Sequence, residues 1–188
     1  MNNRIYMFRG KAATGKTSLA HYLGKKYQLL TLSKDDLFDV CFQHGFSIKE
    51  CNSLAYDLLV KLIQQSIHQS LDLIVDVGLS DTQSLIQFLS RIEMNSSELV
   101  LFHCDCKDEL VWKCRIQDRL RHPLPHQFFT SFEEAKNYYE KSNIEQLDNE
   151  IYVDSSRPFD ENIQSIAHYF EKQKTIMTIV YHGYCFGG

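Results

Sequence analysis

Eight residues near the amino terminus have the types and the spacing of a phosphate-binding loop. The stretch Gly10-Lys11-Ala12-Ala13-Thr14-Gly15-Lys16-Thr17 fits the pattern G-x-x-x-x-G-K-[ST] at every fixed position. In such a loop the glycines let the backbone wrap a phosphate, the lysine reaches the outer phosphates, and the hydroxyl takes a place on Mg²⁺. We therefore expect residues 10–18, which include Ser18, to bind a nucleoside triphosphate.

The residues on both sides of this loop favour the same interpretation. Residues 5–8 form a short apolar run typical of a buried strand, and residues 17–23 continue as a helix with apolar positions on one face. A glycine-rich turn without a ligand is the alternative, but only a nucleotide site needs Lys16 and Thr17 where they are. The sequence predicts a strand, a phosphate loop and a helix in direct succession.

Three aspartates follow apolar runs and are candidates for the chemistry. Asp35 and Asp36 come just after residues 28–32, and Asp76 ends the run Leu-Ile-Val-Asp. A carboxylate can take or align the proton of an acceptor hydroxyl, and an aspartate at a strand end can hold Mg²⁺ or its water. Acids in a first helical turn or at a strand end can also have no ligand. The residues alone leave Asp35 and Asp36 open as the base, and favour Asp76 as the metal partner of Thr17.

Two arginines, Arg115 and Arg119, lie four residues apart and so share a helix face. Cations of this kind can clamp the charge that spreads over a transferring phosphoryl group. The alternative is a solvated helix face paired with neighbouring acids. A loop with two prolines follows, and we expect residues 121–139 to form a mobile lid that closes on the nucleotide and expels water.

Composition excludes several classes of protein. The 188 residues are 44% hydrophobic with a net charge of −4, which indicates a globular fold and gives no basic footprint for nucleic acid. We see no signal peptide and no apolar run of membrane-spanning length. The six cysteines favour reduced thiols and a cytoplasmic location. His103, Cys104 and Cys106 lack a second cysteine pair for a zinc site, so we interpret them as a buried strand end.

Apolar runs alternate with helical patterns along the chain. Further strands are expected at residues 28–32, 71–77, 99–104 and 151–154, and helices at 47–67, 81–94, 107–120, 132–147 and 160–172. This alternation predicts a parallel sheet with helices on both faces, and its strand ends meet at one edge where ligands bind. We expect the helical segment 46–70 to wall the acceptor pocket.

The last residues, 175–188, are too apolar for a free tail. They could form a sixth strand, a packing arm or a contact in a homodimer. We therefore divide the chain into a domain of residues 1–174 and an apolar extension of residues 175–188.

Together these residues resemble the small P-loop kinases, the group that includes AAA-type ATP-binding proteins, polynucleotide 5′-kinase, chloramphenicol phosphotransferase and the zeta toxins. The resemblance spans residues 4–170 and is carried by GKAATGKT, LSKDDLF, LIVD, HCDCKDELVWKCRIQDR and YVDSSRPFDENI. It implies a three-layer α/β fold with a five-stranded parallel sheet in the order 2-3-1-4-5 and a helical lid.

The resemblance also implies roles for single residues. Asp35 becomes the preferred general base, Arg115 or Arg119 belongs to the lid, and the loop with Arg157 lies near the adenine. Phe38 stands where several members of the group have an arginine. This departure favours an apolar contact with the acceptor and disfavours a polynucleotide.

The function expected from the sequence is transfer of the γ-phosphoryl group of ATP, with Mg²⁺, to a hydroxyl of a small molecule. Lys16, Asp35, Arg115 and Arg119 would be catalytic, residues 10–18 with Arg119 and Arg157 would bind nucleotide, and Thr17 and Asp76 would hold the metal. The alternatives are a polynucleotide 5′-hydroxyl or nucleotide-sugar kinase, and an ATP-binding switch without catalysis. Nucleic acid and membrane are not expected as partners.

Overall fold

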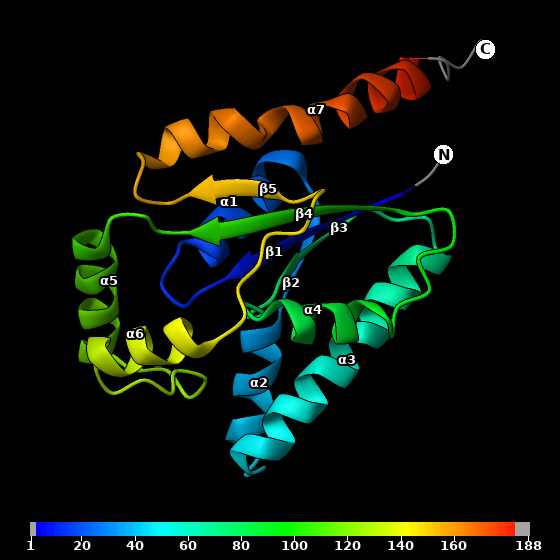
Figure 1. The fold of residues 1–188 in the computed structure, drawn as a ribbon. Coiled ribbons are helices and arrows are strands. Elements are labelled where there is room, and N and C mark those ends of the chain that lie inside the picture. The colour runs from blue at the N-terminus through cyan, green and yellow to red at the C-terminus, as the bar shows by residue number, and fades with distance from the viewer. Residues whose placement is uncertain (1–2, 183–188) are drawn as a thin grey trace. The chain divides into compact units, whose positions relative to one another are not determined.

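The computed structural model describes residues 3–182, and side chains as far as residue 171. The chain forms two units, Met1–Ser156 and Arg157–Gly188, which are considered separately. The elements of the first unit are β1 (Arg4–Gly10), α1 (Lys16–Tyr27), β2 (Leu30–Ser33), α2 (Lys34–Gln43), α3 (Ile48–His68), β3 (Leu73–Asp76), α4 (Thr82–Leu89), β4 (Glu98–Asp105), α5 (Glu109–Arg121), α6 (Phe132–Lys141) and β5 (Ile151–Asp154). The second unit contains α7 (Phe159–His182). Figure 1 shows these elements along the chain.

The five strands form one parallel sheet in the order β2-β3-β1-β4-β5, which confirms the predicted fold class. Its register brings the carboxyl ends of the strands together, because Asp76 lies beside both Phe8 and Ser33. At the other half of the sheet, Asp105 lies beside Asp154. Helices α5 and α6 lie beyond these strand ends (Figure 1). The candidate residues therefore meet at one edge of the sheet.

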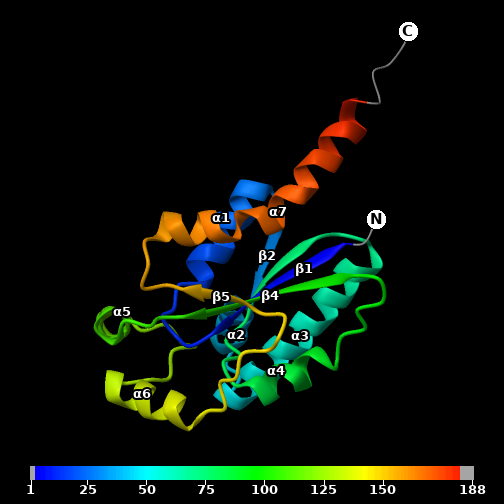
Figure 2. The same cartoon turned by 45° about the horizontal axis from the view of Figure 1, so that its top comes forward.

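Helices cover both faces of this sheet (Figure 2), with α1 on one side and α3 and α4 on the other. The reason is the apolar stripe of each helix, because burying this stripe against the sheet removes it from water and lowers the free energy. Helix α1 buries Leu19 and Leu23. On the opposite face one core cluster joins residues of α3, α4 and the strands: Ile5, Met7, Leu59, Ile63, Ile67, Leu73, Val75, Val77, Leu85, Phe88, Ile92 and Leu101.

A buried ion pair anchors the chain between α6 and β5. Arg9, next to the phosphate loop, pairs with Glu150, and both side chains are fully buried. The Arg9 guanidinium also donates to the backbone oxygens of Ser80 (2.8 Å) and Glu145 (2.7 Å). Because a buried guanidinium needs such acceptors, residues 142–150 leave the helical path and cross to it. The helix predicted for residues 132–147 accordingly ends at Lys141.

Two other predicted helix ends differ widely from the structure. Helix α4 ends at Leu89, earlier than the predicted residue 94, and α7 continues to His182, beyond the predicted residue 172. The backbone of residues 175–182 is therefore helical, whereas a sixth strand was one of the alternatives. Residues 183–188 lie outside the described part of the chain. The homodimer contact suggested for residues 175–188 stays a prediction, as does the domain boundary at residue 174. Within the described residues, no helix combines the length and the apolar character needed to cross a membrane.

Candidate active site

The phosphate loop connects β1 to α1 and depends on its two glycines. Gly10 has φ 137°, and a Cβ placed there would lie 1.9 Å from the carbonyl oxygen of Cys104. Gly15 has φ 79° and is the N-cap of α1, with no side chain bonded to the first-turn N–H groups. Glycine alone adopts the first position without a clash, and the free helix start suits an anion.

Lys16, Thr17 and Asp76 meet below this loop. The Thr17 hydroxyl donates to Asp76 Oδ2 at 2.6 Å, and Lys16 Nζ donates to the carbonyl oxygen of Lys11 at 2.7 Å. Burial lowers the pKa of Lys16 and raises the pKa of Asp76, and their mutual attraction opposes both shifts. A hydroxyl and a carboxylate are hard oxygen donors, which Mg²⁺ prefers. These two side chains therefore fit the magnesium site predicted for Thr17 and Asp76.

Helices α5 and α6 contact the phosphate loop through the backbone N–H and carbonyl groups of Ala12. Its N–H donates to the hydroxyl of Tyr139 at 2.8 Å, and its carbonyl accepts from Trp112 Nε1 at 2.9 Å. Lys11 Nζ pairs with Asp105 at 3.1 Å. Burial raises the pKa of Tyr139 to about 12, so the phenol stays protonated at neutral pH. One residue of α5 and one of α6 thus hold the backbone of the same loop residue.

Helix α2 brings acids and a lysine to the other side of the site. Ser33 caps the helix by accepting from the N–H groups of Asp35 and Asp36. The Asp35 side chain faces a cavity, whereas Asp36 is exposed and does not line it. Lys34 is buried, its ammonium lies 3.6 Å from Asp35 Oδ1, and burial lowers its pKa. The structure thus brings Asp35, and not Asp36, to the cavity.

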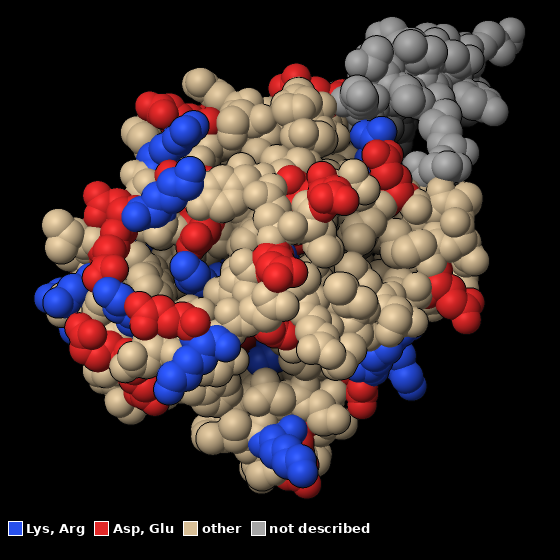
Figure 3. Space-filling view, viewed as in Figure 1, with Lys and Arg blue, Asp and Glu red and all other residues tan. Residues whose placement is uncertain are grey.

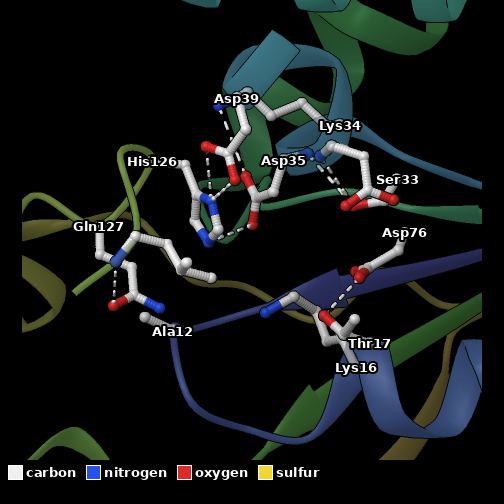
Figure 4. A network of polar contacts seen from close by, with 12 residues as sticks. Ala12, Lys16, Thr17, Ser33, Lys34, Asp35, Asp39, Asp76, His126 and Gln127 are labelled. Atoms are coloured by element: carbon white, nitrogen blue, oxygen red, sulfur yellow. Dashed lines mark hydrogen bonds and ion pairs between the residues drawn. The ribbon is translucent and has the colours of Figure 1, made fainter. Parts of the chain in front are cut away.

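A histidine from the proline loop contacts the same helix. His126 Nδ1 lies 3.0 and 2.9 Å from the two carboxylate oxygens of Asp39, and its Nε2 lies 3.6 Å from Asp35 Oδ2. Figure 4 shows His126 between the α2 side chains, with Lys16, Thr17 and Asp76 across the site. Neither His126 nor Asp39 was singled out from the sequence. The only signal was the i, i+4 spacing of Asp35 and Asp39, which places both acids on one helix face.

One cavity of about 480 Å³ connects the phosphate loop to α2. Its lining residues come from the loop, α2, α3 and the lid: Gly10, Ala12, Lys16, Thr17, Lys34, Asp35, Asn52, Tyr56, Gly78, Ser80, Ile116, Arg119, Leu120, His126, Gln127, Phe128, Phe129, Glu134, Tyr138 and Tyr139. Helix α3 contributes Asn52 and Tyr56 to the wall of this cavity, and the role of the segment 46–70 in holding an acceptor stays a prediction.

Phe38 does not have the role suggested by the sequence. Its side chain is fully buried, in a cluster with Cys41, Cys51 and Ala55, and it does not line the cavity. The ring faces the α2–α3 contact because it is the large apolar residue there. The apolar wall is supplied instead by Phe128 and Phe129 of the lid. An acceptor contact through Phe38 is therefore wrong.

The three arginines differ in their surroundings. Arg119 lines the cavity, whereas Arg115 donates to the hydroxyl and to the carbonyl oxygen of Ser155, both at 2.8 Å. Arg115 thus holds the residue after β5. Arg157 is exposed at the start of the second unit. The catalytic role of Arg115 and the nucleotide contact of Arg157 stay predictions.

Comparison with known proteins now adds to this geometry. Residues 5–138 match the family model AAA_33, described as an AAA domain. A search of curated proteins finds no significant match. Similar solved structures include a protein of Chloroflexus aurantiacus provisionally described as a kinase, which is 20% identical with a TM-score of 0.74 and covers 92% of this chain and 98% of its own.

Two further solved structures are named as kinases. A sugar kinase of Janibacter sp. is 16% identical with a TM-score of 0.62, covering 90% of this chain and 95% of its own. A gluconokinase of Sinorhizobium meliloti is 12% identical with a TM-score of 0.58, covering 95% of this chain and 96% of its own. At these identities the likeness shows a shared fold.

Proposed function

Since this chain belongs to the AAA domain family and has the fold of the small P-loop kinases, we propose that it is a phosphotransferase. It would use ATP and Mg²⁺ and move the γ-phosphoryl group to a hydroxyl of a small molecule. One observation carries the proposal. A single cavity joins Lys16 and Thr17 of the phosphate loop to Asp35 on α2, so both partners of a transfer have side chains ready for them.

Each residue has a role that follows from its position. Lys16 and the loop N–H groups would hold the β and γ phosphates, and Thr17 and Asp76 would hold Mg²⁺. The metal, when bound, supplies positive charge to the phosphate oxygens. Asp35 would take the proton of the acceptor hydroxyl, and Arg119 would neutralise charge on the transferring group. Arg115 would join it only after leaving Ser155.

The acceptor side of the cavity favours a small molecule with hydroxyl groups. Asn52, Tyr56 and Ser80 offer hydrogen bonds there, and Phe128 and Phe129 offer an apolar wall. Positive and negative side chains are interspersed on the face seen in Figure 3, which gives no basic track for a polynucleotide. Because two relatives are named as a sugar kinase and a gluconokinase, sugars and sugar acids are the first acceptors to test.

We also propose that the enzyme acts in the cytoplasm. ATP is available there, and the described cysteines, among them the exposed Cys114, are free thiols. A reducing compartment keeps such thiols from forming disulfides.

The test is transfer of label from γ-labelled ATP to sugars, sugar acids, nucleosides, antibiotics and 5′-hydroxyl oligonucleotides. Wild type should label at least one small molecule, and Lys16→Ala should lose at least about a hundredfold in kcat, because the phosphate charge is no longer neutralised. Asp35→Asn should also lose transfer while it still binds ATP.

Three results would contradict the proposal in different ways. ATP binding without transfer to any acceptor would favour the switch. Preferred labelling of the oligonucleotide would favour the polynucleotide kinase. A Lys16→Ala protein as active as wild type would exclude this site as the place of transfer.

A further inference from the structure

The lid histidine has a defined orientation. The side chain of Asp39 is a carboxylate that accepts hydrogen bonds and cannot donate them, so the close contact at 2.9 and 3.0 Å requires the hydrogen on Nδ1 of His126. A hydrogen bond at one ring nitrogen fixes the state of the other. The lone pair of neutral His126 is therefore on Nε2, on the side of Asp35, at 3.6 Å from its Oδ2.

Two carboxylates of α2 lie close to His126. Asp35 and Asp39 are like charges four residues apart on one helix, an arrangement that costs free energy unless a cation lies near. Lys34 supplies one cation, at 3.6 Å from Asp35 Oδ1. A protonated His126 would supply a second, between the two carboxylates. The charged groups that line the cavity from other elements are Lys16, Arg119 and Glu134.

We propose that His126 is a positioning residue for the transfer, which acts through Asp35 by relieving it of the acceptor's proton. The inference rests on the proposed phosphotransferase function. As the acceptor oxygen forms its bond to the γ phosphorus, the bond from that phosphorus to the bridging oxygen of ADP breaks. The acceptor O–H bond breaks as well, and its proton passes through Asp35 to Nε2 of His126. Asp39 holds the resulting imidazolium, which loses the proton to solvent when the products leave.

The proposed proton path joins side chains from two separate elements. His126 belongs to the loop between α5 and α6, whereas Asp35 and Asp39 belong to α2. The loop is shaped by a turn in which Gln127 N donates to the carbonyl oxygen of Leu124 at 2.9 Å. In return the Leu124 N–H donates to Gln127 Oε1 at 3.2 Å, the contact drawn at Gln127 in Figure 4. The proton path is therefore complete only while the lid lies on α2. Water exclusion and activation of the acceptor then occur together.

The first test compares His126→Gln with His122→Gln, the same substitution at an exposed position of the same loop. Glutamine keeps a polar group but carries no proton away. With the acceptor that is labelled best in the panel, His126→Gln should lower kcat about ten- to a hundredfold, at the lower end of general acid–base effects, with the KM for ATP changed less than about twofold. His122→Gln should match wild type. An unchanged kcat in His126→Gln would overturn the inference.

A double variant separates a proton path from simple packing. Because Asp35 and His126 would handle the same proton, Asp35→Asn with His126→Gln should be no slower than Asp35→Asn alone. Losses that multiply would show that the two residues act independently and would reject the path. Thermal melting of each variant checks that the fold is kept.

A third measurement needs no acceptor. The ¹⁵N chemical shifts of the His126 ring report which nitrogen carries hydrogen, and we expect Nδ1 to carry it in wild type and to lose this preference in Asp39→Asn. A hydrogen on Nε2 alone in the neutral wild-type ring would overturn the inference. If wild type labels no acceptor, the proposed function fails while the orientation of His126 is still decided by these shifts.

Discussion

At the scale of single residues, the phosphate loop depends on backbone space as much as on its lysine. The Cα of Gly10 lies against the carbonyl of Cys104 on the neighbouring strand β4, at a φ of 137° that side chains rarely adopt. A hydrogen at this Cα is all that the close approach of β1 and β4 permits. The first fixed glycine of the motif is therefore also a condition for forming the sheet.

Gly10→Ala should consequently destabilise the protein strongly. The added methyl would lie 1.9 Å from the Cys104 carbonyl oxygen, so strands must separate, and we expect a loss of at least about 3 kcal/mol in the free energy of unfolding. Gly45→Ala is the matched control, because Gly45 also has a positive φ, 85°, but nothing lies within 4 Å of the added Cβ. Gly45→Ala should lower the free energy of unfolding by about 1–2 kcal/mol. Urea unfolding measures both, and equal losses would contradict this account.

At the scale of elements, the segment between α6 and β5 is held by charge and not by regular structure. Burial by itself would raise the pKa of Glu150, but contacts with His103 and Arg9 lower it to about 2. A hydrogen bond also joins this segment to α4, since the Thr82 hydroxyl donates to the carbonyl oxygen of Glu145 at 2.6 Å. The chain that follows the carboxyl end of α6 is thereby fixed to β1, the strand that leads into the phosphate loop.

Glu150→Gln should lower the free energy of unfolding by about 3–5 kcal/mol at pH 7, because it leaves the guanidinium of Arg9 buried without its counter-charge. The lowered pKa sets the sign of the pH effect. Wild-type Glu150 contributes stability above about pH 4.5, the value in the unfolded chain, and loses it as the pH falls toward 2.

Urea unfolding at pH 7 and pH 3 tests this prediction. The difference in the free energy of unfolding between wild type and Glu150→Gln should be smaller at pH 3 than at pH 7. Glu98→Gln removes an exposed partner of Arg4 and should change stability by less than about 1 kcal/mol. If the difference in unfolding free energy between wild type and Glu150→Gln were larger at pH 3 than at pH 7, the lowered pKa of Glu150 would be contradicted.

At the scale of the whole molecule, the lid connects the two halves of the site within the first unit. It contacts the phosphate loop through Tyr139 and Ala12, and it contacts α2 through His126 and Asp39. Apolar contacts accompany these polar ones, because Phe128 packs edge-on against Phe38 with ring centroids 5.7 Å apart, and Phe132 and Ala135 share a buried cluster with Ala13 of the loop. Opening and closing of residues 121–139 stays a prediction, which limited proteolysis can test.

Nucleotide should slow cleavage of this lid by trypsin. Arg121 is exposed at the end of α5, where the chain leaves the helix. A non-hydrolysable ATP analogue with Mg²⁺ would add contacts to Arg119 in the last turn of α5, and we expect the half-life of cleavage at Arg121 to rise several-fold. Mg²⁺ alone is the control and should give no protection. Faster cleavage with the analogue would contradict a closing lid.

Local pattern was enough for much of this protein. The phosphate loop has its chemistry in eight consecutive residues, and the alternation of strand and helix patterns predicts a parallel sheet without knowledge of long-range contacts. The strand order came from resemblance to a family. It is confirmed by the pairing of the strands.

The tertiary structure decided what local spacing does not encode. His126 and Asp39 meet although they are 87 residues apart, and Arg9 and Glu150 although they are 141 apart. Similarly, Asp35 and Asp36 are equivalent as a sequence pair, and only the helix rotation turns one of them to the cavity. Burial of Phe38 followed from packing of α2 on α3, which its own neighbours in sequence do not reveal. Side-chain direction and long-range pairing are properties of the packed chain, and for this reason the proposed proton path could be inferred only from the fold.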